Sequence, residues 1–245
     1  MTVNPLPTGT FRVEIDADHG GRWTSLIDRA GREWLWSQPC PARSQVRPGN
    51  AFVDAGGVEE CFPTVTGVPD HGDVWTRAWA ADGGGMTVKT GAFTLHRRLS
   101  VGTDITVDYR LTGPPGAAFV WAFHALLRPD VGSRIVADAT LSRIWAEDGQ
   151  PVDDHWPVIA GRPGGDVLGP DDGSAVFCVL PQLQHGVSVQ QGTRGCGCGW
   201  TATRPRCPSG SGGTSVVFPH RGCGTAPSGS SRRWAAHRQC SRDVG

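Results

Sequence analysis

The chain has 245 residues with 23 basic and 23 acidic side chains, so its formal net charge is zero. A neutral chain has no overall electric field to attract nucleic acid or an anionic membrane, and we expect neither as a partner. The N-terminal segment lacks a basic start followed by an apolar run, and the sequence contains no stretch of roughly 18 apolar residues. These features predict a cytoplasmic protein without a secretory signal or a membrane span.

Alternating apolar and polar residues predict a succession of strands. In TFRVEIDAD, Phe11, Val13 and Ile15 alternate with polar residues, which is the period of a strand with one buried face. RWTSLID and REWLW follow as a hairpin, in which Gly31 supplies the positive φ of the turn. Further strands are predicted in MTVKTGAFTLHRRLSV, TDITVDYRLTG, AFVWAFHALLR, SRIVAD and SAVFCVLPQ. No helical pattern of useful length intervenes, so the sequence predicts an antiparallel β-sandwich domain over residues 1–185.

The segment CFPTVTGVPDHGDVWTRAW, from Cys61 to Trp79, shows neither the strand nor the helix period. It combines two prolines and two tryptophans with charged residues and a histidine, which predicts a shaped loop. Loops that concentrate aromatic and charged groups often carry function.

Four segments together resemble a known family. GGRWTSLIDRAGREWLW, AGGVEECFPTV, PDHGDVWTRAW and FVWAFHALL follow one another in the order seen in aldose 1-epimerases and the wider galactose mutarotase-like group. The resemblance covers about residues 9–185 and is strongest at PDHGDVWTRAW. It implies a large all-β antiparallel supersandwich, here C-terminally incomplete, with a sugar cleft on its concave sheet. It leaves open which sugar binds, whether that sugar is phosphorylated, and the oligomeric state.

The reaction of such proteins interconverts the α and β anomers of a sugar. A base takes the proton of the C1 hydroxyl while an acid protonates the ring oxygen, so that the ring opens and closes again. Histidine and a carboxylate can both work near neutral pH, and no metal or other cofactor is needed.

His124 is the candidate catalytic acid. The alternation in AFVWAFHALL places His124 on the face opposite Trp121 and Phe123, amid small residues. By resemblance it occupies the position of the family's general acid. The alternative interpretation is a partly buried histidine that bonds a neighbouring strand.

The loop supplies the candidate substrate-binding residues. By resemblance, His71 lies over the cleft and bonds the sugar, and Trp75 offers a flat apolar face to it. Three further side chains can bond sugar hydroxyls, namely Glu60, Asp73 and Arg77. The alternative interpretation is a loop held together by the ion pairs of its own Asp70 and Arg77.

The sequence lacks a counterpart of the glutamate that serves as general base in the family it resembles. In the family this glutamate lies in the last third of the chain, whereas the last glutamate here is Glu147. Three functions therefore remain open: an impaired aldose 1-epimerase, a non-catalytic sugar-binding sandwich, and a truncated pseudoenzyme.

Residues 186–245 differ in composition from the rest. They hold eight arginines and one acidic residue, Asp243, and are rich in Gly, Ser and Pro, so we expect a disordered or out-of-frame tail in which only TSVVF forms a strand. Five cysteines lie here without a CxxC pair, and their spacing matches no standard zinc site. The 22 arginines and single lysine of the chain indicate a GC-rich gene, and a frameshift between Gln184 and Gly195 accounts for the tail.

Overall fold

The computed structural model describes residues 11–102, 104–172, 176–181, 183, 186–192, 194–199, 213–219 and 235–239. The chain forms two compact units, Met1–Arg128 and Pro129–Gly245. The domain boundary expected at 185 from composition stays a prediction. Across the described residues the only helices are two short 3-10 helices, η1 (Pro41–Gln45) and η2 (Val74–Thr76). The prediction of an all-β chain is therefore confirmed.

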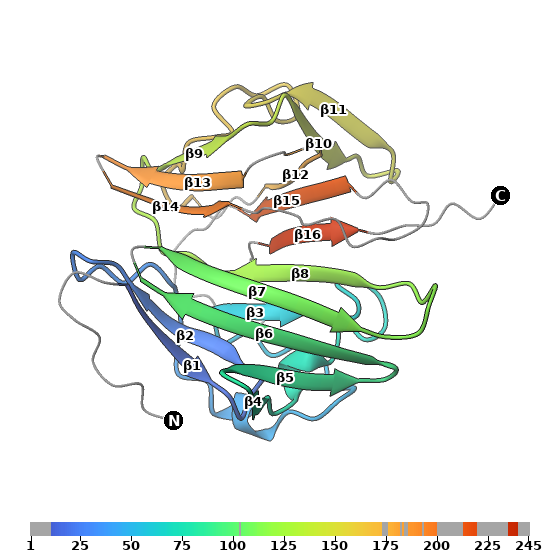
Figure 1. Cartoon of the computed structure of the whole chain (residues 1–245). Helices are drawn as coiled ribbons and strands as arrows, with labels where there is room; N and C mark the ends of the chain where they lie inside the picture. The colour runs from blue at the N-terminus through green and yellow to red at the C-terminus, as the bar shows by residue number, and fades with distance from the viewer. Residues whose placement is uncertain are drawn as a thin grey trace. The chain divides into compact units, whose positions relative to one another are not determined.

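The first unit contains two sets of four antiparallel strands (Figure 1). One has the order β1-β2-β3-β8, made of Arg12–Asp16, Arg22–Ile27, Val58–Cys61 and Val120–Ala125. The other has the order β4-β5-β6-β7, made of Ala80–Asp82, Gly85–Thr90, Phe93–Val101 and Ile105–Thr112.

The two sheets of this unit enclose a core of apolar and aromatic side chains. Phe62, Val88 and Leu95 are buried there, and the half-buried Tyr109 and Trp121 pack against them. The alternation predicted for the strands is clearest in β7, where half-buried and exposed residues follow one another without exception. β3 differs, because all four of its residues are buried. Both faces of β3 are therefore covered by protein.

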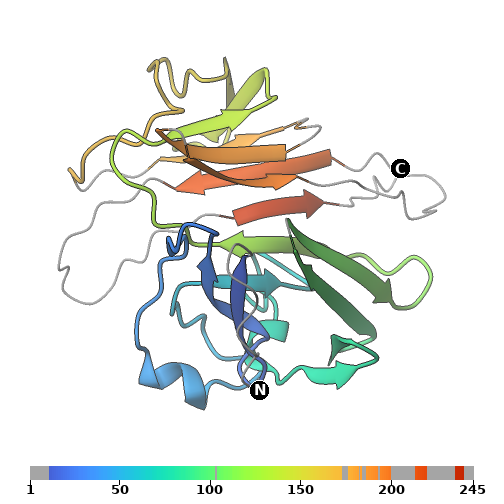
Figure 2. The same cartoon turned by 60° about the vertical axis from the view of Figure 1, so that its left-hand side comes forward.

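The second unit also contains two antiparallel sheets, which can be followed in Figure 2. One has the order β16-β15-β12-β10-β11, made of Ala235–Gln239, Gly213–Pro219, Phe177–Leu180, Leu141–Trp145 and Pro151–His155. The other has the order β14-β13-β9, made of Arg194–Gly199, Gly186–Gln191 and Arg134–Ala137.

Four of these strands lie within residues 186–245, where the sequence predicts one. The strand expected in TSVVF is β15, and β13, β14 and β16 were not predicted. β13 pairs with β9 in continuous register and buries Val189, so the residues up to Gln191 belong to the packing of this unit. The disorder expected for 200–212, 220–234 and 240–245 lies outside the described residues.

The described part of the chain contains no helix with the length and the apolar character needed to cross a membrane.

Candidate functional site

The pairing of β3 with β8 fixes the base of the candidate site. Glu59 lies opposite His124, and Cys61 lies opposite Ala122. Residues directly opposite each other in an antiparallel pair share a face, and so do residues two apart along one strand. Glu59, Cys61 and His124 therefore project from the same face of the sheet.

His71 reaches this face from the loop that follows β3. The loop folds back on the end of the strand, since Phe62 and Gly72 form an isolated parallel bridge and the His71 N–H donates to the Val65 carbonyl at 2.9 Å. His71 and Gly72 both have left-handed backbones, with φ of 61° and 68°. A Cβ at Gly72 would lie 2.1 Å from the Phe62 carbonyl oxygen, so glycine permits the close contact that holds the loop in place.

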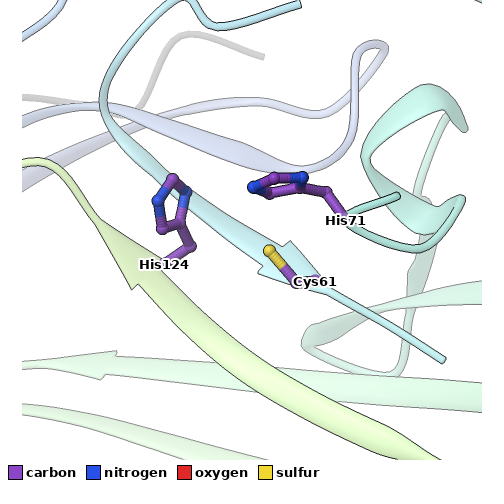
Figure 3. Close-up of side chains that lie close together, drawn as sticks. All are labelled: Cys61, His71 and His124. Carbon is purple, nitrogen blue, oxygen red and sulfur yellow. The ribbon is translucent and has the colours of Figure 1, made fainter. Parts of the chain in front are cut away.

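The structure brings His71 and His124 together (Figure 3). Their ring centroids lie 5.5 Å apart at an interplanar angle of 65°. The Cys61 sulfur lies beside them, and one nitrogen of each ring and this sulfur are all within 4.8 Å of one another. Cys61 and His124 are buried, whereas the His71 side chain is 14 % exposed. His71 therefore lies on the side of the cluster that solvent reaches.

Phe52 and Asp70 orient the His71 ring. The Phe52 ring stacks on it with centroids 4.0 Å apart and planes 16° from parallel. The Nδ1 of His71 lies 2.9 Å from an oxygen of Asp70. The His71 ring is thus held on its face by an aromatic side chain and on its edge by a carboxylate.

A buried charge cluster supports the same face of β3. The Arg43 Nη1 lies 3.1 Å from Glu59 Oε1, and both side chains are almost fully buried. Burial raises the pKa of Glu59 to about 7, although Arg43 and Arg22 favour its charged form. Burial also lowers the pKa of Arg22, whose Nη1 donates to two backbone carbonyls. Arg43 pairs with Glu59, and Arg22 braces the segment before β3 through its backbone hydrogen bonds.

Glu60, which the sequence predicts to bond a sugar, lies away from the two histidines. Its carboxylate points to the opposite face of β3, into the core between the sheets. There it accepts hydrogen bonds from Trp121 at 2.8 Å, from Arg97 at 3.3 Å and from the Tyr109 hydroxyl. Burial raises the pKa of Glu60, and it raises that of Tyr109 well above its usual value. Glu60 is therefore buried among its hydrogen-bond partners between the sheets.

Trp75 is also placed differently from its expected role. The side chain is 1 % exposed and its Nε1 donates to the Gly72 carbonyl at 2.9 Å. The Arg43 guanidinium covers the ring, with 4.6 Å between its carbon and the ring centroid, and Phe52 packs against the edge. Trp75 supports Phe52 and presents no open face to a sugar.

Asp73 and Arg77 pair with each other. Arg77 Nη2 lies 2.8 Å from Asp73, which also accepts a hydrogen bond from Thr90 of β5. This agrees with the alternative interpretation of the loop, in which its own ion pairs hold it together. Of the predicted site residues, His71 and His124 thus lie together, and Asp73 and Arg77 fasten the loop.

Cys61, Phe52 and Arg43 were missed by sequence reasoning. The spacing of Cys61 could have revealed its place in the site, because Cys61 lies two positions after Glu59 in β3 and so shares its face. The strand VEEC shows no alternation, however, and so its faces could not be assigned. Phe52 and Arg43 lie in a segment without periodicity.

Comparisons of sequence found no matching family model and no matching curated protein. Comparisons of structure found three solved proteins of the same fold. A candidate mutarotase, YeaD of Salmonella typhimurium, superimposes with a TM-score of 0.53 at 15 % identity, over 97 % of this chain and 88 % of that one. A candidate aldose 1-epimerase of Escherichia coli K12 gives a TM-score of 0.57 at 12 % identity, over 96 % and 86 %. The chain has a mutarotase-like fold. The protein HI1317 has it as well, with a TM-score of 0.52 at 12 % identity, over 96 % and 84 %.

The likeness extends over nearly the whole chain, which includes the residues after 185 that the sequence resemblance does not cover. At these identities it establishes the fold alone. The functional argument therefore rests on the site itself.

Proposed function

We propose that the chain binds an aldose at the face formed by His71 and His124 and interconverts its anomers. The observation that supports this most is the convergence of the two rings, 5.5 Å apart, from a loop and a strand that are distant in sequence. In a mutarotase-like fold, two imidazoles on one sheet face can provide the acid of ring opening and a ligand for a sugar hydroxyl.

The proposed roles follow from burial. His124 is almost fully enclosed on β8 and is held by a regular strand, so it is suited to deliver a proton to one fixed position, the ring oxygen. His71 is partly exposed and oriented by Asp70, so it is suited to bond an incoming hydroxyl. Protonation of the ring oxygen by His124 and transfer of the C1 hydroxyl proton to a solvent water open the ring. Rotation about the C1–C2 bond exposes the other face of the carbonyl, and closure returns both protons and gives the second anomer.

Water is a weak acceptor for the C1 hydroxyl proton. Glu59 shares the face of His124, but its carboxylate is buried in an ion pair with Arg43, and we assign it a structural role. Without a positioned carboxylate, the reaction loses a contribution that is typically about 10²–10⁴-fold. We therefore expect slow catalysis.

A second candidate function is sugar binding without catalysis. It is favoured by the absence of any glutamate after Glu147 in the sequence. In that case the two histidines serve as hydrogen-bonding ligands only.

Polarimetry on freshly dissolved α-glucose, α-galactose and their 6-phosphates tests the proposal. The chain should accelerate mutarotation of at least one sugar above the spontaneous rate, and His124→Ala should abolish the acceleration. His96→Ala is the matched control, because His96 lies on β6 of the other sheet, paired with Asp82 at 3.0 Å, and should change nothing. Sugar-dependent tryptophan fluorescence without any acceleration would replace the first candidate by the second. Neither acceleration nor binding would refute both.

A further inference from the structure

We propose that Cys61, His71 and His124 form a binding site for a zinc ion. No sequence motif predicts a metal here, because Cys61 stands alone in its segment and the proposed reaction needs none. The structure gathers one sulfur and two imidazole nitrogens within 4.8 Å of one another.

The donor set suits zinc. Thiolate and imidazole are the ligands that zinc prefers, and sites with three protein ligands leave a fourth position for water or another ligand. In a tetrahedral zinc site the usual Zn–S and Zn–N bond lengths place the ligand atoms roughly 3.3–3.6 Å apart. Separations of up to 4.8 Å require closure by up to about 1.2–1.5 Å, which a small shift of the loop that carries His71 can supply.

A second observation points to a ligand. The histidine ligands of metal sites almost always bond a carboxylate or carbonyl through their other ring nitrogen, which fixes the tautomer and the direction of the ring. His71 has this arrangement, because its Nδ1 lies 2.9 Å from Asp70 and its other ring nitrogen points toward His124 (Figure 3). Phe52 stacks on the same ring and limits its rotation.

The surroundings restrict the coordination to these three residues and one outer position. Cys61 packs with Ala122 and Val65 on its apolar side, and His124 is buried on β8. The fourth position therefore lies toward the exposed edge of His71. A zinc ion bound here occupies the nitrogens that the proposed proton transfer uses, so it should inhibit mutarotation reversibly.

The test is a titration with Co²⁺, which reports zinc sites by its absorption spectrum. The full chain is used with serine at the cysteines of residues 186–245, which are Cys196, Cys198, Cys207, Cys223 and Cys240. We expect one equivalent to bind, with a thiolate-to-cobalt band in the near ultraviolet and the visible bands of tetrahedral cobalt, all of which zinc abolishes on displacement.

Variants of the cluster decide which residues bind. Cys61→Ser should abolish the thiolate band, and His71→Gln should weaken binding, whereas Cys40→Ser, at the half-buried free cysteine of the same unit, should leave the spectrum unchanged. Asp70→Asn should lower the affinity about 10–100-fold if Asp70 orients the ligand. Circular dichroism checks that each variant is folded. Because His71 lies on a loop, the His71→Gln variant remains informative if Cys61→Ser fails to fold.

The metal readout is independent of sugar binding, so the site and the proposed function can fail separately. Absence of cobalt binding would overturn the proposal. So would a thiolate band that persists in Cys61→Ser, or an affinity that His71→Gln does not change.

Discussion

Glu59 and Glu60 are neighbours in sequence, yet they serve opposite faces of β3. Glu59 pairs with Arg43 on the histidine face, and Glu60 pairs with Arg97 between the sheets. Removing one partner of a buried ion pair leaves an uncompensated charge, so Glu60→Ala should lower the free energy of unfolding by about 3–5 kcal/mol, as measured by urea denaturation.

The exposed pair of Arg143 and Asp153 provides the comparison for Glu60. Its nitrogen and oxygen lie 2.6 Å apart, but water screens both groups, and Asp153→Ala should change the urea midpoint little. If Glu60→Ala left stability unchanged and removed sugar binding instead, the placement of Glu60 in the core would be wrong.

Cys178 on β12 should be an inert thiol. Burial raises the pKa of Cys178 to about 11, so that at pH 8 only roughly one thiol in a thousand is ionised. Since the thiolate is the nucleophile, alkylation by iodoacetamide should be slow in the native protein and rapid in urea, followed at this residue by mass spectrometry. Equal rates in both conditions would show that Cys178 is not enclosed.

At the scale of elements, the loop after β3 is what assembles the site. Gly72→Ala should lower the free energy of unfolding by about 1–3 kcal/mol and weaken sugar binding, because the new Cβ strains a left-handed backbone and collides with the Phe62 carbonyl. Urea denaturation and tryptophan fluorescence measure the two effects.

Gly31→Ala separates the two causes. Gly31 also has a left-handed backbone, with φ of 82°, but a Cβ there meets nothing within 4 Å. This variant should therefore show the conformational cost alone, about 1–2 kcal/mol, with sugar binding intact. A Gly72→Ala variant that behaved like Gly31→Ala would contradict the role of the close contact.

The strand pattern explains how much of the fold and the site could be predicted. β7 alternates between half-buried and exposed residues, and the alternation in β8 placed His124 on the face opposite Trp121. β3 shows no alternation, because both of its glutamates are buried against arginines that are distant in sequence. No local pattern reveals these pairs. Without β3 as a strand, the faces of Glu60 and Cys61 could not be assigned. The partners of Trp75, which are Arg43 and Phe52, could not be predicted either, since they come from a segment without periodicity.

At the scale of the whole molecule, the composition of residues 186–245 still requires an explanation. We expect that the chain read in the alternative frame after about Gln184 gains a glutamate and further strands. It should then be more soluble and more active than the 245-residue chain, because it regains a base and covers exposed strand edges. Soluble yield and polarimetry compare the two. Full family-level activity from the 245-residue chain, lost on His124→Ala, would show that a base exists within it.

The central claim is that His71 and His124 form one sugar site, and a double-mutant cycle of sugar affinity tests it most directly. Tryptophan fluorescence gives the dissociation constants of the unmodified chain, of His71→Ala, of His124→Ala and of the double variant. The two rings lie 5.5 Å apart, so their effects should be coupled by about 0.5–3 kcal/mol, and the double variant should lose less than the sum of the single losses. Additive losses, or affinities that neither substitution changes, would contradict the claim.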